Sequence, residues 1–263
     1  MKNGEIIRNK RLKDNYFRVD FYSPELCKQA KAGQFAHVKI CGIPNKVLRR
    51  PFSISDVSSE GLLTIIYKVV GAGTEALSSL KPGDTCDIMG PLGNPFSPSV
   101  KSDIPVIIAG GYGAAATYLI AKNSPSPGIL LLGARTAKDL ILTDEFKRLG
   151  FEVKVSTEDA SEGYGGRVTG LMEELLADKN RRNMKFYACG PHGMLMAAGK
   201  LILQHGLDGE LSLDHLMCCG VGACFACVVK VKADNSDGWR YARTCKEGPV
   251  FKASEVYYDL EPE

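Results

Sequence analysis

The stretch VIIAGGYG at residues 106–113 marks a change of pattern along the sequence. It begins with consecutive apolar residues, as in a strand buried on both faces, and it ends in glycines. After it, segments typical of strands alternate with segments typical of helices. Further strands are expected at GILLLGA (128–134), FEVKVST (151–157) and MKFYACG (184–190), and helices at 116–123, 142–150, 165–178 and 193–206. We expect Thr169 to cap the third of these helices and Gly206 to end the last. Alternating strands and helices predict a parallel, doubly wound α/β sheet.

Upstream of this stretch the apolar segments are short and alternate with polar residues. Gly, Pro, Asn and Asp separate them at intervals of about ten residues, which is typical of a small antiparallel β-barrel. The segments are FRVDFY (17–22), FAHVKI (35–40), FSISDV (52–57) and LLTIIYKVV (62–70), and turn residues in 81–96 close the region. We therefore predict three domains: an all-β barrel over 1–100, an α/β domain over 101–209 and a small cysteine-rich domain over 210–263.

The cysteines are concentrated in that last region. Five of the nine lie within CCGVGACFACVVKVKADNSDGWRYARTC at 218–245. Their spacing from the second cysteine is C-x4-C-x2-C, with the last cysteine after residues 228–244, and plant-type ferredoxins hold a [2Fe–2S] cluster with such a spacing. Gly220 and Gly222 allow a tight loop whose N–H groups approach the sulfurs. The predicted metal ligands are Cys219, Cys224, Cys227 and Cys245, the last one carried by a later strand.

Two other interpretations of these cysteines stay open. Thiolates also bind structural zinc, although mostly as paired C-x2-C knuckles, and buried thiols can act as small hydrophobic side chains. Cys218 adjoins the first predicted ligand, and its side chain is expected to point elsewhere. The remaining cysteines, Cys27, Cys41, Cys86 and Cys189, are scattered.

RRPFSIS at 49–55 and VVGAGTEAL at 69–77 indicate a flavin dinucleotide such as FAD. The Arg50 guanidinium can bind a phosphate with two hydrogen bonds, and Ser53 can hydrogen-bond the flavin. Gly71 and Gly73, followed by Thr74, leave N–H groups free at the start of a helix, where a diphosphate binds well. Either motif alone also fits an ordinary surface strand or a strand–turn–helix connection.

Two strand ends in the α/β region predict a site for a dinucleotide. Gly111 and Gly113 form part of a degenerate dinucleotide fingerprint, and Cys189 and Gly190 end another strand in CGPHGM. Parallel strands present their carboxyl ends at one edge, where such sheets bind ligands. Each loop could equally be a tight strand–helix connection.

Composition excludes some classes of protein. The formal net charge is +3, from 33 basic and 30 acidic residues, which is not the footprint of a nucleic-acid-binding protein. The sequence has no apolar run of the length that crosses a membrane and no apolar core of a signal peptide at its start. We therefore expect a cytoplasmic protein that binds neither nucleic acid nor membrane.

The order of motifs resembles the ferredoxin–NADP reductase superfamily with an iron–sulfur tail. The motifs are R-P-F-S (50–53), G-x-G-T (71–74), G-P-L-G (90–93), C-G-P (189–191), C-G-V-G-A-C-x-x-C (219–227) and C-x-x-G-P-V-F (245–251). Within the superfamily the whole chain is most similar to the electron-transfer subunits of class B dihydroorotate dehydrogenases. Tyr112 and Cys218 depart from the family pattern, which usually has a glycine and a small apolar residue there.

The resemblance implies an oxidoreductase subunit with FAD on the barrel, NAD on the α/β domain and a [2Fe–2S] cluster in the tail. Electrons would pass from the FMN of a catalytic dihydroorotate dehydrogenase subunit through the cluster and FAD to NAD+, in pyrimidine biosynthesis. The complex would be a heterotetramer with two subunits of each kind, and this chain would supply no catalytic acid or base. By motif match, the flavin contacts would be Arg50, Pro51, Phe52, Ser53, Tyr67, Lys68, Val69, Gly73 and Thr74.

Two alternative functions remain. Relatives with the same three domains serve as NAD(P)H-oxidising diaphorase subunits of other complexes, of the sulfite reductase or ferredoxin-dependent type. A redox-sensing or zinc-binding scaffold without turnover is the third hypothesis.

Overall fold

An antiparallel sheet forms the N-terminal part of the computed structural model, which describes residues 2–40, 48–178, 183–213 and 216–258. Its strands, in the spatial order β4-β3-β7-β1-β2-β6-β5, are β1 (Lys2–Lys13), β2 (Tyr16–Tyr22), β3 (Phe35–Lys39), β4 (Arg50–Ser53), β5 (Asp56–Val57), β6 (Leu62–Lys68) and β7 (Thr85–Leu92). Two helices accompany them, α1 (Pro24–Gln29) and α2 (Ala72–Ser79). Strand β7 lies where only turns were expected, because Gly90 and Pro91 interrupt its alternation.

This sheet curls so that its two edge strands meet. Strands β4 and β5 are the edges and follow one another in the chain. Between them, the Ile54 N–H donates to the Gln34 carbonyl and the Ser55 N–H to the Thr64 carbonyl. The sheet is therefore barrel-like, as predicted, although no continuous ladder closes it.

The second sheet is parallel except for its last strand. Its order is β11-β10-β9-β8-β12-β13-β16, with β8 (Ile104–Gly110), β9 (Ile129–Ala134), β10 (Glu152–Thr157), β11 (Tyr164–Gly165), β12 (Met184–Cys189), β13 (Asp208–Ser212) and β16 (Val250–Lys252). Its helices are α3 (Gly113–Lys122), α4 (Thr143–Arg148), α5 (Val168–Ala177) and α6 (His192–Gln204), with the 3-10 helices η1 (Ala137–Asp139) and η2 (Ala253–Glu255).

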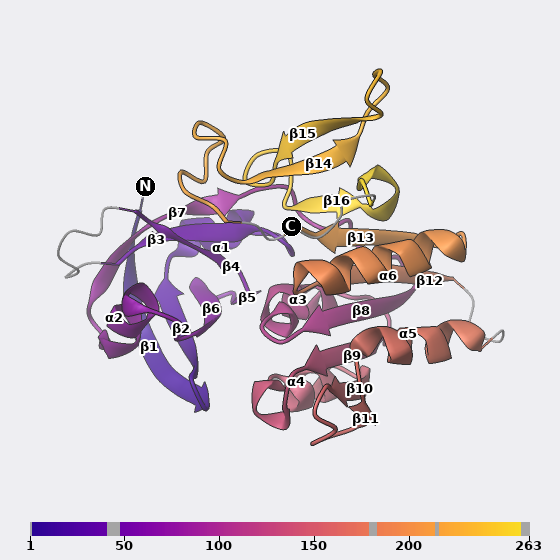
Figure 1. Cartoon of the computed structure of the whole chain (residues 1–263). Helices are drawn as coiled ribbons and strands as arrows, with labels where there is room; N and C mark the ends of the chain where they lie inside the picture. Colours follow the sequence, from indigo (N-terminus) through magenta and orange to yellow (C-terminus); the bar gives the residue numbers. More distant parts are fainter. Residues whose placement is uncertain (1, 41–47, 179–182, 214–215, 259–263) are drawn as a thin grey trace.

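Helices cover both faces of this sheet, which confirms the doubly wound prediction (Figure 1). Along β8, Val106 and Ile108 join the core formed with α5 and α6. Ile107 and Ala109, which point the other way, join the core formed with α3 and α4. The uninterrupted apolar run in this strand is thus explained by burial on both faces.

The two helix boundaries predicted from single residues had different outcomes. Gly206 has φ +62 and its N–H donates to the Leu203 carbonyl, so it ends α6 as expected. The Thr169 cap is wrong: Arg167 occupies the N-cap position with an extended backbone, and Thr169 is the second residue of α5.

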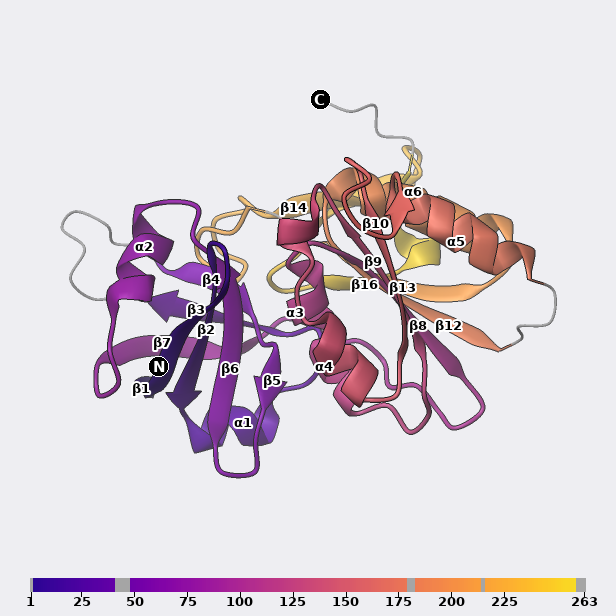
Figure 2. The same cartoon turned by 90° about the horizontal axis from the view of Figure 1, so that it is seen from below.

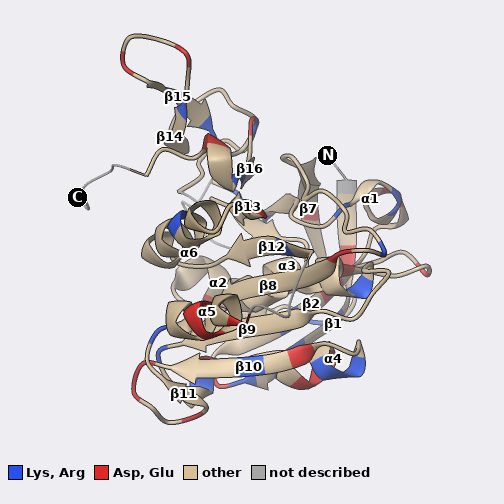
Figure 3. Cartoon of the chain, turned by 90° about the vertical axis from the view of Figure 1, so that its right-hand side faces the viewer, with Lys and Arg blue, Asp and Glu red and all other residues tan. Residues whose placement is uncertain are grey.

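The barrel and the α/β domain lie side by side, with α3 facing the barrel (Figure 2). An ion pair crosses this boundary, since Lys122 Nζ on α3 is 2.6 Å from Asp56 Oδ1 on β5. Basic and acidic residues are interspersed over the face seen in Figure 3. Within the described ranges, no helix has both the length and the apolar character needed to span a bilayer.

The C-terminal segment is attached to the α/β sheet at both ends. Strand β13 pairs in parallel with β12, and β16 pairs in antiparallel fashion with β13. Between them, β14 (Val228–Lys232) and β15 (Trp239–Arg243) form a separate hairpin (Figure 1), joined by residues 233–238. The division at 100 and 209 remains a prediction, and β13 runs across the second boundary.

Candidate cofactor sites

The four predicted metal ligands form two pairs. The thiols of Cys219 and Cys224 lie within hydrogen-bonding reach of each other, and so do those of Cys227 and Cys245. Among the described residues, no three His, Cys, Asp or Glu side chains converge on a point that could hold one ion. Two thiolates for each of two irons is what a [2Fe–2S] cluster requires, whereas structural zinc needs four ligands around one ion. The donor set therefore fits the cluster.

The loop around Cys219 is preorganised to stabilise a thiolate. The N–H groups of Val221 and Ala223 point at its sulfur, at 3.5 and 3.3 Å. Burial opposes ionisation, but these N–H groups and that of Cys224 outweigh it and lower the pKa of Cys219 to about 6. Gly220 and Gly222 make this geometry possible, with φ of +70 and +81.

The other pair, Cys227 and Cys245, is buried. Burial first, and then the neighbouring Cys227, raise the pKa of Cys245 to about 12, so a bound cation has to displace its proton. This cysteine follows β15 in a turn, which corrects the expectation that a strand carries it. Cys218 is half-buried with a free thiol, and Cys41 lies outside the described residues.

The loop at 219–227, here called the cluster loop, packs on the outer surface of the barrel. Phe35 on β3 forms one buried hydrophobic cluster with Met217 and with the predicted ligands Cys227 and Cys245. In Figure 1 the loop that precedes β14 lies over β3 and β7. Cys224, by contrast, is exposed, so one side of the site faces the barrel and the other faces solvent.

The two flavin motifs are close together. A Cβ atom at Gly73 would lie 2.6 Å from Arg50 Nε, so the guanidinium on β4 packs against the start of α2. The Thr74 hydroxyl holds the preceding turn by accepting hydrogen bonds from the Val70 and Gly71 N–H groups. A guanidinium and a helix N-terminus, two groups that commonly bind phosphate, thus lie side by side on the barrel.

The three predicted flavin contacts at the end of β6 and just after it, Tyr67, Lys68 and Val69, take different positions. Tyr67 is buried, its ring packs against Phe17 and Phe52, and its hydroxyl donates to Asn9. Burial raises the pKa of this tyrosine. Tyr67 therefore supports β4 from inside the barrel, whereas the Lys68 side chain extends to the α/β domain. Val69 is held by a hydrogen bond from its N–H to the Asn15 carbonyl.

A narrow crevice of about 30 Å³ separates β4 from the C-terminal segment. Pro51, Phe52 and Ser53 line one side of it, and Met217 and Pro249 belong to the segment opposite. The strand predicted to hold the flavin is therefore next to the segment that carries the cysteines.

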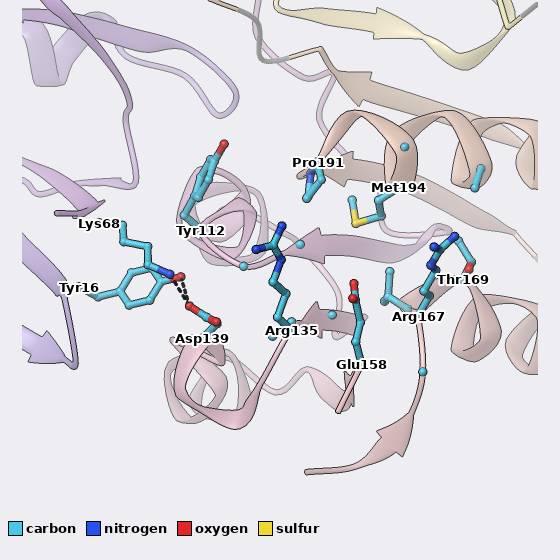
Figure 4. A pocket seen from close by; sticks show the side chains of 18 residues that line it. Tyr16, Lys68, Tyr112, Arg135, Asp139, Glu158, Arg167, Thr169, Pro191 and Met194 are labelled. Atoms are coloured by element: carbon cyan, nitrogen blue, oxygen red, sulfur yellow. Dashed lines mark hydrogen bonds and ion pairs between the residues drawn. The ribbon is translucent and has the colours of Figure 1, made fainter. Parts of the chain in front are cut away.

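A larger pocket of about 520 Å³ opens at the carboxyl edge of the parallel strands. Strand β8 lies between β9 and β12 there, so the chain order reverses at this point, where open α/β sheets bind dinucleotides. The side chains around it (Figure 4) include Tyr16, Lys68, Tyr112, Arg135, Asp139, Glu158, Arg167, Thr169, Pro191 and Met194. The volume, the position and the start of α5 at its wall suit a dinucleotide.

The predicted NAD residues play two roles in this pocket. Gly111 lines it, with φ +52. The other three hold the two strand-end loops together: a Cβ atom at Gly113 would lie 2.0 Å from the Cys189 carbonyl oxygen, and one at Gly190 would lie 2.8 Å from the Gly110 nitrogen.

Two charged residues of the pocket were not predicted from the sequence. Arg135 directly follows β9 and Glu158 directly follows β10, and both point into the pocket in Figure 4. Their position after predicted strands was a usable signal, because the same edge rule had located the glycines.

The barrel also contributes to this pocket through a charged contact. Lys68 Nζ and the Tyr16 hydroxyl both bond Asp139 Oδ1, at 2.6 and 3.0 Å. Burial opposes ionisation of Asp139, but these two partners outweigh it and lower its pKa. Burial and then Asp139 raise the pKa of Tyr16. The contact joins the two domains at the rim of the pocket.

Comparison with known proteins agrees with these sites. Residues 5–96 match the oxidoreductase FAD-binding domain, 107–200 the oxidoreductase NAD-binding domain, and 214–257 the iron–sulfur cluster binding domain of dihydroorotate dehydrogenase B. The fold and sites thus define an oxidoreductase subunit with a ferredoxin reductase-like fold that uses FAD, NAD and a [2Fe–2S] cluster.

Curated relatives specify the family. The chain is 40% identical over 230 residues to the dihydroorotate dehydrogenase B (NAD(+)) electron transfer subunit of Fusobacterium nucleatum, covering 85% of this chain and 86% of that protein. The subunit from Enterococcus faecalis is 37% identical over 257 residues, covering 95% and 96%. The chain therefore belongs to the family of dihydroorotate dehydrogenase B electron transfer subunits.

A solved structure extends the comparison. It is that of an NADH-dependent reduced ferredoxin-NADP oxidoreductase, with a TM-score of 0.83 and 33% identity, over 97% of this chain and 90% of the other. The FAD/NAD-binding domain of a nitric oxide dioxygenase from Vibrio cholerae, at 20% identity, a TM-score of 0.66 and coverage of 80% and 97%, shares the fold alone.

Proposed function

We propose that the chain carries electrons from the FMN of a dihydroorotate-oxidising partner through its cluster and FAD to NAD+. The observation that carries this proposal is the contact between the cysteine loop and the barrel. The cluster ligands Cys227 and Cys245 pack directly on β3, next to the strand with the flavin motif. On the other side, Tyr16 and Lys68 of the same barrel line the nucleotide pocket.

In this proposal the predicted residues bind the cofactors or support the elements that bind them, and none transfers a proton. Arg50 and the start of α2 hold the flavin diphosphate, with Thr74 fixing the turn. Gly111 and the start of α5 receive the nicotinamide dinucleotide, while Gly113, Cys189 and Gly190 keep its two loops in contact. Bound FAD exchanges a hydride with a nicotinamide and single electrons with an iron–sulfur cluster, so the protein supplies position and electrostatics.

The exposed side of the cluster loop is the proposed contact with the catalytic subunit. Cys224 is exposed there, and its neighbours Val221 and Phe225 are 51% and 60% exposed. Apolar and aromatic side chains are typical of the core of protein interfaces, and electron transfer needs the cluster close to the partner. We further propose a heterotetramer with two subunits of each kind.

We also propose a cytoplasmic location. The described cysteines all have free thiols, which fits a reducing compartment.

Analysis of the purified chain tests the proposal. Protein prepared without oxygen should contain about two irons and two acid-labile sulfides per chain, together with one equivalent of FAD, and NADH should bleach the flavin. Zinc in place of iron, or a flavin that NADH does not reduce, would overturn the proposed function.

A second function is supported by one of the relatives. The NADH-dependent reduced ferredoxin-NADP oxidoreductase has a chain that this protein matches over most of its length, so the chain could equally oxidise NAD(P)H for another complex. Mixing the chain with a catalytic dihydroorotate dehydrogenase subunit separates the two. Formation of NADH from dihydroorotate supports the first function. Failure to form a complex with that subunit, although NADH still bleaches the flavin, supports the second.

A further inference from the structure

His37 occupies an unusual position on β3. Its strand neighbours Ala36 and Val38 point into the barrel core, so His37 points outward, where a side chain normally meets solvent. It is nevertheless fully buried, at 0% exposure. The cluster loop is close to it, since a Cβ atom at Gly220 would lie only 2.7 Å from His37 Nδ1.

Both ring nitrogens of His37 lack a hydrogen-bond partner among the described residues. A neutral imidazole carries one N–H donor and one acceptor, and leaving a buried donor unpaired costs free energy. The neighbouring Phe35 ring meets the imidazole edge-on at 6.0 Å and accepts no ordinary hydrogen bond. The described residues therefore offer no hydrogen-bond acceptor to the ring N–H.

The position of His37 favours the [2Fe–2S] cluster as the acceptor of this hydrogen bond. Gly220, which the imidazole touches, follows the ligand Cys219 directly, and on the other side His37 pairs with Pro51 of the flavin strand β4. We propose that His37 donates its ring N–H to a sulfur of the [2Fe–2S] cluster and thereby sets its reduction potential. The inference rests on the cluster of the proposed function.

The direction of the effect follows from charge. Reduction adds negative charge to the cluster sulfurs, so an N–H donor stabilises the reduced state and raises the potential. His37→Leu keeps an apolar side chain in place but removes the donor. It should shift the reduction equilibrium about tenfold toward the oxidised cluster, which is about 59 mV for a one-electron couple. His37→Asn places an amide N–H near the position of Nδ1 and should recover most of the shift.

The test is a redox titration of the cluster-loaded protein followed by electron paramagnetic resonance (EPR). The matched control is Ser156→Ala, which removes another buried, unpartnered polar atom, but on β10 of the other domain, and it should leave the potential unchanged. A potential equal in His37→Leu and the wild type would overturn the inference.

A second measurement does not depend on the folding of His37→Leu. Pulsed EPR of the reduced wild-type protein, labelled with ¹⁵N-histidine, should show nitrogen coupling to the cluster, and labelled His37→Asn should lose it. A normal cluster spectrum without that coupling would overturn this inference alone. A wild-type protein without iron would overturn the proposed function, and this inference with it.

Discussion

The cluster loop and the nucleotide pocket differ in how the chain builds them. Three of the four predicted cluster ligands lie within residues 219–227, so their spacing can be recognised in the sequence. The pocket draws on the ends of β8, β9, β10 and β12 and on two barrel residues. A local site depends on the conformation of one segment, whereas an assembled site depends on contacts between segments. Substitutions should therefore affect the two sites independently.

The largest effect is expected from removal of a buried cluster ligand. Cys227→Ser should abolish iron binding, because two irons need all four thiolates. NADH should still bleach the flavin, since the nucleotide pocket is built elsewhere. Iron content and flavin absorbance measure the two effects. Cys218→Ser is the matched control and should retain its iron; loss of iron there would show that the ligand assignment is wrong.

The next effect tests why the loop contains Gly220. Gly220→Ala should weaken cluster retention strongly, because the residue has φ +70 and a Cβ atom would press on His37. Gly206 has a similar φ of +62 but open space around its Cβ position. Gly206→Ala should therefore lower the free energy of unfolding by backbone strain alone, about 1 kcal/mol. Comparing the thermal stability of the two cluster-loaded variants isolates the contact with the imidazole. Equal losses would argue against that contact.

A smaller and separate effect is expected in the pocket. Gly113→Ala should raise the KM for NADH about tenfold or more, because the added methyl group would collide with the Cys189 carbonyl and separate the two loops. Gly193→Ala, on the same rim but with open space around its Cβ position, should change KM little. Iron content should be normal in both, and a loss of iron in Gly113→Ala would contradict the independence of the two sites.

The smallest effect concerns the contact between Asp139 and Lys68. Asp139→Asn should cost about 1 kcal/mol or less, as for other partly exposed ion pairs. The folded-state pKa of Asp139 is lowered from 3.8, so its contribution is complete above the unfolded pKa and disappears as the pH falls through the folded one. Urea unfolding at neutral and acid pH measures this. A difference between wild type and variant that persists in acid would contradict the assignment.

The sequence predicted those features that depend on local pattern. The apolar runs of the buried strands, the glycine that ends α6 and the spacing of the four cysteines could all be recognised in the sequence. The meeting of Arg50 with Gly73 was predicted only as a shared function, because their distance depends on how the barrel curls. The pairing of β13 and β16 with the α/β sheet was not visible, since short strands in a cysteine-rich segment resemble a separate domain.

Other features needed three-dimensional contacts. Arg135 and Glu158 were missed because single charged residues after strands are common and only the fold brings them together. His37 carries no signal in the sequence, since an outward residue on an alternating strand is expected to be exposed. Its burial results from a loop that is distant in the chain.

Electron flow through the reconstituted complex tests the central claim most directly. The chain should be combined with its catalytic dihydroorotate dehydrogenase subunit, and NADH formation from dihydroorotate and NAD+ followed at 340 nm. The account predicts steady formation of NADH with the wild-type chain and none with Cys227→Ser, although that variant still binds the partner and its flavin is still reduced by NADH. Undiminished NADH formation by the variant without its cluster would contradict the account.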